Sequence, residues 1–300
     1  MIIKTTGSIG SGLYVLGTNR IPIYLLDGKS PVLFEGGFSC LGPAYKNDLQ
    51  KVLGGRRPEY LFLTHVHFDH CGSAAFLKKH FPEMKIAGSK RAAEILFRPG
   101  AIKLISVLNQ AGKESMEKWF PDLSSKEVFQ PFVIDQVLSD GDRIDLGEDL
   151  HVEVLATPGH TWDSLSYYVP EKKILIASES AGCQDHTGYM FTEFLVDFQA
   201  YLESIVRLSR LDVEIFCQGH GSVFIGKEAK AFFARSLEAA QKFKQVVEEC
   251  LSAERGDIQK AVNRIKAVEY DPKPEPKQPE PAYLLNIEAR VKHLAGLMKF

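Results

Sequence analysis

The sequence predicts an α/β domain to about residue 225, followed by a helical C-terminal part. Short apolar runs bounded by glycine turns indicate strands over most of the first 225 residues, and helical patterns interrupt them. After Gly226, apolar residues recur at helical spacing instead. With 45% hydrophobic and 25% charged residues among 300, the chain has the composition of a globular protein with a substantial core.

Residues 1 to about 88 are predicted to form strands, tight turns and one helix. Turn residues such as Asp27-Gly28 separate the apolar runs. The expected strands cover 2–5, 12–16, 21–26, 32–35 and 60–64. The helix begins near Gly72 and ends near Phe81-Pro82.

The middle of the chain is predicted to hold two helices and a second group of strands. Residues 90–120 are helical because Ile102, Ile105 and Leu108 follow a spacing of three, and Pro99-Gly100 divides the segment. The later strands are 133–138, 144–146, 152–156, 165–169 and 174–177. A helix over 197–208 and a last short strand over 213–217 complete the domain.

The C-terminal part is predicted to be helical, with one proline-rich interruption. A Phe-rich stripe is interpreted first as core packing; it comprises Phe232, Phe233, Leu237, Ala240, Phe243, Val247 and Leu251. Residues 258–268 continue helically, and 271–281 are expected to form an extended, polyproline-like strap. A terminal helix follows from about 284 to 298.

The segment His65-Val-His67-Phe-Asp69-His70 places three imidazoles and a carboxylate within six residues. Clusters of these residue types are typical of metal sites. The strand before the motif and the helix after it place it on a loop at one edge of a sheet. Rigid elements on both sides can hold such a loop in a fixed geometry.

Three further strand ends also deliver potential metal ligands. His160 lies in Thr157-Pro-Gly-His160, and His220 lies in Gln218-Gly-His220-Gly, where the glycines permit close backbone approach. Glu179 follows the strand 174–177. The remaining histidines, His80, His151, His186 and His293, lack this context and are assigned to the surface or to packing.

The bulk properties exclude several classes of protein. A net charge of −2 without a basic block disfavours nonspecific nucleic-acid binding. Five scattered cysteines without paired spacing favour reduced thiols in a cytoplasm. The first residues lack a signal-peptide pattern, and no apolar run approaches a membrane span. We therefore expect a cytoplasmic protein with neither nucleic-acid nor membrane partners.

The order of these motifs resembles the metallo-β-lactamase superfamily, over residues 1 to about 225. The resemblance implies an αββα sandwich with a helical insertion at about 90–120. It also implies that 226–300 form a C-terminal helical extension packed over the active-site side. Within the superfamily, the helical tail resembles the glyoxalase-II-like branch. The segments 63–72 and 197–208, with the inserted helices, look most like alkylquinolone-signalling acyl-CoA thioesterases.

The resemblance also implies a role for each donor. One metal would be held by His65, His67 and His160, and a second by Asp69, His70 and His220. Glu179 stands where relatives usually have a bridging Asp. Because Glu is one methylene longer, it could bridge, bind one metal only, or force a different spacing.

Two other carboxylates are considered beside these donors. Asp185 is a substitute ranked below Glu179 because it lies past the strand end. Glu35 is expected to support the metal loop from behind.

These assignments imply a hydrolase with two divalent ions, which could be Zn, Fe or Mn because all seven ligands are nitrogen or oxygen donors. A metal-bound hydroxide would attack a small ester or thioester, with an acyl or aryl thioester favoured. Asp69 would be both a ligand and a proton acceptor. Several aromatic and apolar residues could line an apolar pocket mouth or simply pack between sandwich and tail; they are Phe38, Trp162, Tyr189, Met190, Phe191, Phe194 and Phe198.

Two alternative functions stay open. The sequence does not decide whether the protein forms a homodimer. One alternative is an oxygenase like the persulfide dioxygenases, which use a single iron on this fold. The other is a signalling or regulatory protein that retains the metal site mainly for stability. Iron content with oxygen uptake would separate the first from a hydrolase.

Overall fold

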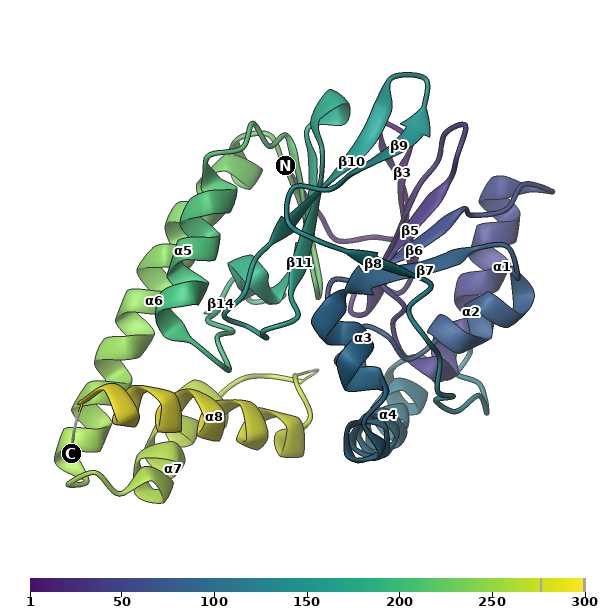
Figure 1. The fold of residues 1–300 in the computed structure, drawn as a ribbon. Helices are drawn as coiled ribbons and strands as arrows, with labels where there is room; N and C mark the ends of the chain where they lie inside the picture. The colour runs from purple at the N-terminus through teal and green to yellow at the C-terminus, as the bar shows by residue number, and fades with distance from the viewer. Residues whose placement is uncertain (276, 299–300) are drawn as a thin grey trace.

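The computed structural model describes residues 1–275 and 277–298, and its core is two seven-stranded sheets with helices on both outer faces (Figure 1). The first sheet has the order β2-β3-β4-β5-β6-β7-β8. Its strands are β2 Gly7–Gly10, β3 Leu13–Gly17, β4 Pro22–Leu26, β5 Val32–Phe34, β6 Tyr60–Phe62, β7 Lys85–Ser89 and β8 Gln136–Leu138. Strands β2 to β5 pair antiparallel, whereas β5 to β8 pair parallel.

The second sheet has the order β1-β16-β15-β12-β11-β10-β9. Its strands are β1 Ile2–Ile3, β16 Val223–Ile225, β15 Ile215–Gln218, β12 Ile174–Ser178, β11 Leu165–Val169, β10 Leu150–Ala156 and β9 Arg143–Gly147. Only β12 and β15 pair parallel in this sheet. The strands β13 Cys183–Gln184 and β14 Met190–Phe191 form a separate hairpin.

The helices are divided between the two outer faces (Figure 1). The first face carries α1 Gly42–Leu53, α2 Ala74–His80, α3 Lys90–Leu96 and α4 Pro99–Trp119. The second carries α5 Phe198–Ser209, α6 Lys227–Ala253, α7 Ile258–Glu269 and α8 Glu280–Met298. Short 3-10 turns lie at Ser39–Leu41, Pro170–Lys172 and Glu179–Ala181.

Three apolar clusters correspond to the three interfaces of this layered fold. Between the sheets, Phe34, Phe62 and Tyr167 pack together with ring centroids 5.1–5.6 Å apart. A second cluster lies under α1–α4, and a third joins the other sheet to α5–α8. Each sheet therefore buries both of its faces, which explains why its central strands are apolar throughout. The expected αββα sandwich with C-terminal helices is confirmed.

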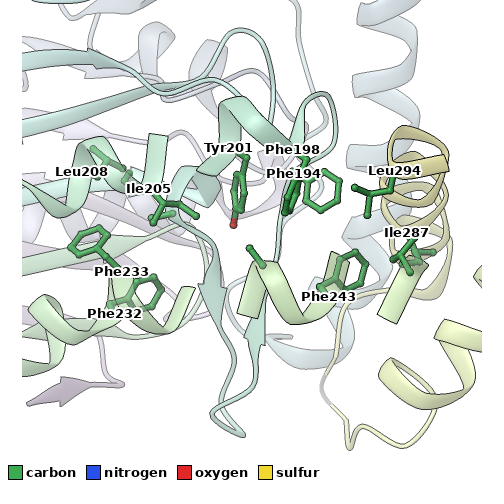
Figure 2. Packing of buried hydrophobic residues seen from close by; sticks show 14 of the residues in the cluster. Phe194, Phe198, Tyr201, Ile205, Leu208, Phe232, Phe233, Phe243, Ile287 and Leu294 are labelled. Carbon is green, nitrogen blue, oxygen red and sulfur yellow. The ribbon is translucent and has the colours of Figure 1, made fainter. Parts of the chain in front are cut away.

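The predicted C-terminal stripe is confirmed as core packing (Figure 2). Phe232 and Phe233 pack against Phe216 of β15, with ring centroids 4.5 and 5.2 Å away. Phe243 contacts Phe194 at 6.1 Å. The fully buried ring of Phe232 alone is worth about 1.5–3 kcal/mol of hydrophobic stabilisation.

Several elements differ from the predictions. The strands β2, β7, β13 and β14 lie where no strand was predicted. Residues 1–88 hold a second helix, α1, whose first residues Gly42-Pro43 resemble a turn; proline is favoured at the first helical positions because its missing N–H has no partner there. The strand over 213–217 is not the last one, since β16 follows the Gly219-His220-Gly221 loop and pairs with both β15 and β1.

The strap ends sooner than predicted, because Glu280 and Pro281 already belong to α8. Residues 271–275 and 277–279 contain neither helix nor strand, and Pro276 lies outside the described residues. The polyproline character of the strap stays a prediction. Among the described residues, no helix has the length and apolar character needed to cross a membrane.

Candidate metal centre

The loop between β6 and α2 carries the first four candidate donors, and its backbone is tied to the neighbouring strand end. Gly36 N donates to His70 O at 2.6 Å, and Ser73 N returns a bond to Gly36 O at 2.9 Å. Close packing requires glycine at position 72, because a Cβ there would lie 2.6 Å from Gly37 O. These backbone contacts therefore fix the loop between two strand ends.

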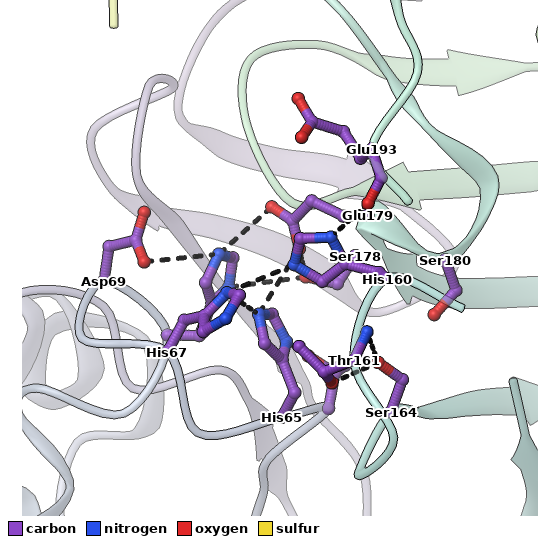
Figure 3. A network of polar contacts seen from close by, with 12 residues as sticks. His65, His67, Asp69, His160, Thr161, Ser164, Ser178, Glu179, Ser180 and Glu193 are labelled. Atoms are coloured by element: carbon purple, nitrogen blue, oxygen red, sulfur yellow. Dashed lines mark hydrogen bonds and ion pairs between the residues drawn. The ribbon is translucent and has the colours of Figure 1, made fainter. Parts of the chain in front are cut away.

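The first donor set comprises His65, His67 and His160, which converge from the motif loop and from the loop after β10 (Figure 3). His67 Nδ1 lies 3.0 Å from His65 Nε2 and 3.1 Å from His160 Nε2. Three imidazole nitrogens around one point have the spacing of ligands on a shared ion, where metal–nitrogen bonds of about 2.0–2.1 Å separate nitrogens by roughly 3.3 Å.

The second donor set comprises Asp69, His70, His220 and Glu179. Glu179 Oε1 lies 3.1 Å from His70 Nε2 and 3.0 Å from His220 Nε2. Asp69 Oδ2 lies 3.5 Å from His220 Nε2. Glu179 Oε2 lies 3.8 Å from His65 Nε2 and accepts a hydrogen bond of 2.6 Å from Ser178 Oγ. The two carboxylate oxygens of Glu179 therefore face different donor sets.

Electrostatics differ between the two sets in the absence of an ion. Burial lowers the pKa of His65, His67 and His160, for His160 to about 3, and the neighbouring imidazoles add to this effect at His65 and His160. Burial also opposes charge on His70, but the carboxylates of Glu179 and Glu35 outweigh it and raise the pKa of His70 well above its usual value. The imidazoles of His70 and His220 in turn hold the pKa of Glu179 low, against the effect of its burial.

These residues fit a metal ion. The first set offers neutral imidazoles with free lone pairs, the protonation state that metal binding needs. In the second set, the buried Glu179 Oε1 has no hydrogen bond of good geometry, although two imidazole nitrogens lie close to it. A divalent cation between these atoms would satisfy the carboxylate once the two imidazoles have released their protons.

Four of the imidazoles are oriented by a second contact through Nδ1, which leaves Nε2 facing the cluster. His160 Nδ1 donates to Glu193 O at 2.5 Å, and His220 Nδ1 donates to Arg20 O at 3.0 Å. His65 Nδ1 lies 3.0 Å from Thr64 Oγ1, which donates to Glu35 Oε1 at 2.7 Å. The same Glu35 oxygen lies 3.4 Å from His70 Nδ1. Glu35 thus contacts both sets from behind.

Close backbone approach accommodates the longer side chain of Glu179. A Cβ at Gly219 would lie 2.1 Å from Glu179 Oε1, so only glycine leaves room for this carboxylate. Ser178, immediately before Glu179, has a φ of +49°, and Glu35 has a φ of +72°. Such left-handed conformations cost about 1–3 kcal/mol for non-glycine residues and cluster at functional sites.

Asp185, the lower-ranked carboxylate, is not part of the cluster. Its Oδ1 accepts hydrogen bonds from Thr187 N at 2.8 Å and Tyr189 N at 3.0 Å, so it caps the turn between β13 and β14. The prediction that Glu179 is the better candidate agrees with this geometry.

The predicted aromatic mouth divides into two groups. Phe194 and Phe198 are buried in the C-terminal core (Figure 2), and Phe38 is buried against Phe68. Trp162 and Tyr189 remain 47% and 39% exposed. Met190 and Phe191 form β14 and are partly buried. Packing therefore explains Phe38, Phe194 and Phe198. Trp162 and Tyr189 retain exposed surface that a ligand could contact.

Several orienting groups escaped sequence analysis. Asp163 Oδ2 accepts from Val66 N at 3.0 Å, and Gln218 joins Gln184 N to the His220 loop. The backbone carbonyls of Arg20 and Glu193 hold imidazoles. Asp163 has a sequence signal because it lies three residues after His160, but a backbone carbonyl has none, since every residue carries one.

Comparisons with known proteins show which family and which relatives the chain resembles. The family described as the metallo-beta-lactamase superfamily matches residues 16–220. An atrochrysone carboxyl ACP thioesterase of Aspergillus fumigatus is 23% identical over 221 residues, which are 74% of this chain and 54% of that protein. A hydroxyacylglutathione hydrolase of Bartonella tribocorum is 30% identical over 198 residues, which are 64% of this chain and 59% of that protein. The chain thus spans less than two thirds of these relatives.

The fold extends beyond the family match. A metallo-beta-lactamase family protein from Thermus thermophilus superposes with a TM-score of 0.66 at 18% identity, covering 97% of this chain and 95% of that protein. At this identity, the likeness concerns the fold alone, and it includes the C-terminal helices.

Proposed function

The chain belongs to the metallo-β-lactamase superfamily, and on that premise we propose that it is a hydrolase of a small acyl or aryl thioester or ester that holds two divalent ions. The observation that carries this proposal is the carboxylate of Glu179, whose two oxygens face separate donor sets. A carboxylate shared between two donor sets is suited to holding a pair of divalent ions.

The donor set favours ions that accept nitrogen and oxygen ligands, so Zn, Fe and Mn are the candidates. His65, His67 and His160 would hold one ion, and Asp69, His70 and His220 the other, with Glu179 between them. When bound, such a pair would supply hydroxide at neutral pH and would polarise a carbonyl group.

The chain's own residues would handle orientation and protons. Asp69 has an 18% exposed side chain, so it is more open to solvent than Glu179 at 4%. A carboxylate with this access can accept a proton at Oδ1 or Oδ2 and release it to water. Glu35, by contrast, is buried beneath the donors and is suited to orienting His65 and His70.

A thioester is favoured for two reasons. A thiolate leaves with little protonation, whereas an alkoxide needs a proton donor, and the carboxylates facing the donors other than Asp69 are buried. The thioesterase and the hydroxyacylglutathione hydrolase among the relatives support the same class of substrate. Trp162 and Tyr189 offer exposed aromatic surface for an acyl or aryl group.

The test combines elemental analysis with turnover. Chelator-free protein should contain two equivalents of metal and hydrolyse members of a panel of acyl-CoA thioesters, acyl-glutathione thioesters and aryl esters. His67→Ala and Asp69→Asn should lower kcat/KM by about 10²–10⁴-fold. His80→Ala, at the exposed end of α2, is the matched control and should leave kcat/KM unchanged.

Two outcomes would overturn the proposal. Fully metallated protein without turnover on the panel would favour a regulatory role for the retained site. One equivalent of iron with oxygen uptake on a persulfide would favour the oxygenase instead.

A further inference from the structure

We propose that helix α8 positions His160 through Arg290 and His293, and so acts as part of the metal centre's supporting structure. The inference rests on the proposed function, because it treats His160 as a metal ligand. The two residues lie about 70 positions beyond the family match at 16–220. They contact the ends of one short segment, residues 192–198, which we call the bridging segment.

His160 depends on the bridging segment for its orientation. Its Nδ1 donates to Glu193 O at 2.5 Å, which directs Nε2 toward His67. The preceding residue is bound to the same segment, because Gly159 O accepts from the backbone N of Leu195 at 3.1 Å and of Val196 at 3.2 Å. A Cβ at Gly159 would lie 2.3 Å from Tyr201 Cα, so the loop and α5 are in tight contact.

Helix α8 holds the bridging segment at its first residue. Arg290 is 2% exposed, and its Nη1 donates to Thr192 O at 2.7 Å. Its guanidinium lies 4.6 Å from the ring centroid of Phe243, and Nη2 lies 3.9 Å from Glu269 Oε2. The carbonyl of Thr192 belongs to the peptide group that joins it to Glu193. Fixing this group restricts the rotation that would move the Glu193 carbonyl away from His160.

The same helix holds the last residue of the bridging segment. His293 Nε2 accepts from Phe198 N at 3.0 Å, the first residue of α5. Arg290 and His293 are three residues apart and therefore lie on one face of α8. Figure 2 shows α8 beside Phe194 and Phe198, the apolar residues of this segment. The helix therefore fixes both ends, with the His160 acceptor between them.

A buried arginine needs a reason, because desolvating a guanidinium costs several kcal/mol unless its partners are well placed. Glu269 provides a charge, but it already accepts hydrogen bonds from Tyr189 OH at 3.0 Å and Tyr283 OH at 2.7 Å. Arg290 lies 2.7 Å from Thr192 O but 3.9 Å from Glu269 Oε2, so its hydrogen-bonded partner of these two is the Thr192 carbonyl. Groups that orient a ligand from behind typically change metal affinity by 10–100-fold when they are lost.

The first measurement is the hydrogen-bonded His160 Nδ1–H proton in the NMR spectrum of the metal-free protein, assigned by its loss in His160→Gln. Arg290→Met and His293→Leu should each increase its exchange with water at least tenfold. Arg290→Lys, which keeps a charged donor, should show a smaller increase.

The second measurement is a Co²⁺ titration followed by absorption, with a competing chelator. The wild type should bind two equivalents. Arg290→Met and His293→Leu should weaken one of them by about tenfold, and Arg290→Lys should recover part of the loss. Tyr168→Phe is the matched control, since it removes a hydrogen bond of 2.9 Å to Asp212 O, and neither residue belongs to α8 or to the bridging segment. It should lower the unfolding temperature and leave both affinities unchanged.

Wild-type affinity in a folded Arg290→Met or His293→Leu protein would overturn the inference, whatever the NMR signal does. An equal loss of affinity in Tyr168→Phe would also overturn it, because general destabilisation would then explain the effect. If the wild type binds no Co²⁺, the proposed function fails on its own, and the NMR exchange rates still decide whether α8 orients His160. Should Arg290→Met not fold, His293→Leu decides, since His293 is only partly buried.

Discussion

The two donor sets differ in how they behave without a metal. His65, His67 and His160 are neutral imidazoles, each with a lowered pKa. The set around Glu179 is an array of opposite charges, in which the pKa of His70 and His220 is raised and that of Glu179 is lowered. The first set is therefore ready to bind a cation, whereas the second must first release protons.

The difference follows from where the carboxylates lie. Glu35 and Glu179 both lie within 3.4 Å of a His70 ring nitrogen, so their charges offset the effect of burial on this imidazole. Within the described part of the chain, no carboxylate oxygen lies so close to His160, whose Nδ1 contact is a neutral backbone carbonyl. One loop thus supplies donors to two electrostatically distinct half-sites.

The largest expected effect comes from removing the group that the two sets share. Glu179→Ala should lower kcat/KM by about 10²–10⁴-fold and weaken binding of the second metal equivalent more than the first. Asp185→Ala is the control, because this carboxylate caps a turn and should not affect metal content. Metal titration measures both affinities. If Glu179→Ala weakened the two metal equivalents equally, the proposed difference between the donor sets would be wrong.

Metal removal should lower the free energy of unfolding, and the loss should be larger for the donor set that binds its ion more tightly. A ligand at 100 times its Kd stabilises the folded state by about 2.7 kcal/mol. Chelation should therefore reduce the free energy of unfolding by about this amount for each occupied set, as denaturant titration would measure. A chelated protein that unfolds like the metal-loaded one would argue against both sets.

The two sets should also differ in their response to pH. Below its raised pKa, His70 carries a proton that a metal must displace, so affinity of the second set falls as pH falls. Each displaced proton gives about a tenfold loss per pH unit. The first set should be insensitive over the same range, because the pKa of His160 is about 3. Metal titrations at pH 8, 7 and 6 would measure both affinities. If the affinities of the first and second metal equivalents fell equally with pH, the two sets would not differ in this way.

The smallest expected effect concerns Glu193, whose side chain points away from the imidazoles (Figure 3). Burial raises the pKa of this carboxyl to about 7. The folded protein therefore keeps a proton that the unfolded chain has released, and stability falls as pH rises from about 5 to 7. Glu193→Gln should be more stable by on the order of 1 kcal/mol at pH 8 and unchanged at pH 4. Thermal unfolding at both pH values measures this; a pH-independent difference would contradict it.

Local sequence patterns were sufficient for most elements of the fold. The apolar strands, the helices on either side of Pro99 and the Phe-rich stripe of α6 are all present, since each has a clear period or a clear break. Helix α1 was missed because Gly42-Pro43 is equally typical of a turn and of a helix start. Strand β16 was missed because it is only three residues long and follows a glycine-rich loop.

The candidate donors could be identified from the sequence because imidazole and carboxylate chemistry is written in the residue type, and each donor follows a strand. Their grouping is different, since it depends on strands far apart in the chain meeting at one edge of the two sheets. Glu179, and not Asp185, lies against these imidazoles, and Gly219 leaves room for its carboxylate.

By itself, the sequence determined which atoms were available to bind a metal: the residue types, their strand-end positions and the glycines beside them. Tertiary structure alone decided which charges surround each imidazole and which groups hold it from behind, including the carbonyl of Glu193 and the arginine of α8. The physical reason is distance. Electrostatic and hydrogen-bond energies depend on separations of a few ångströms, and residues 160, 193 and 290 acquire those separations only when the chain is folded.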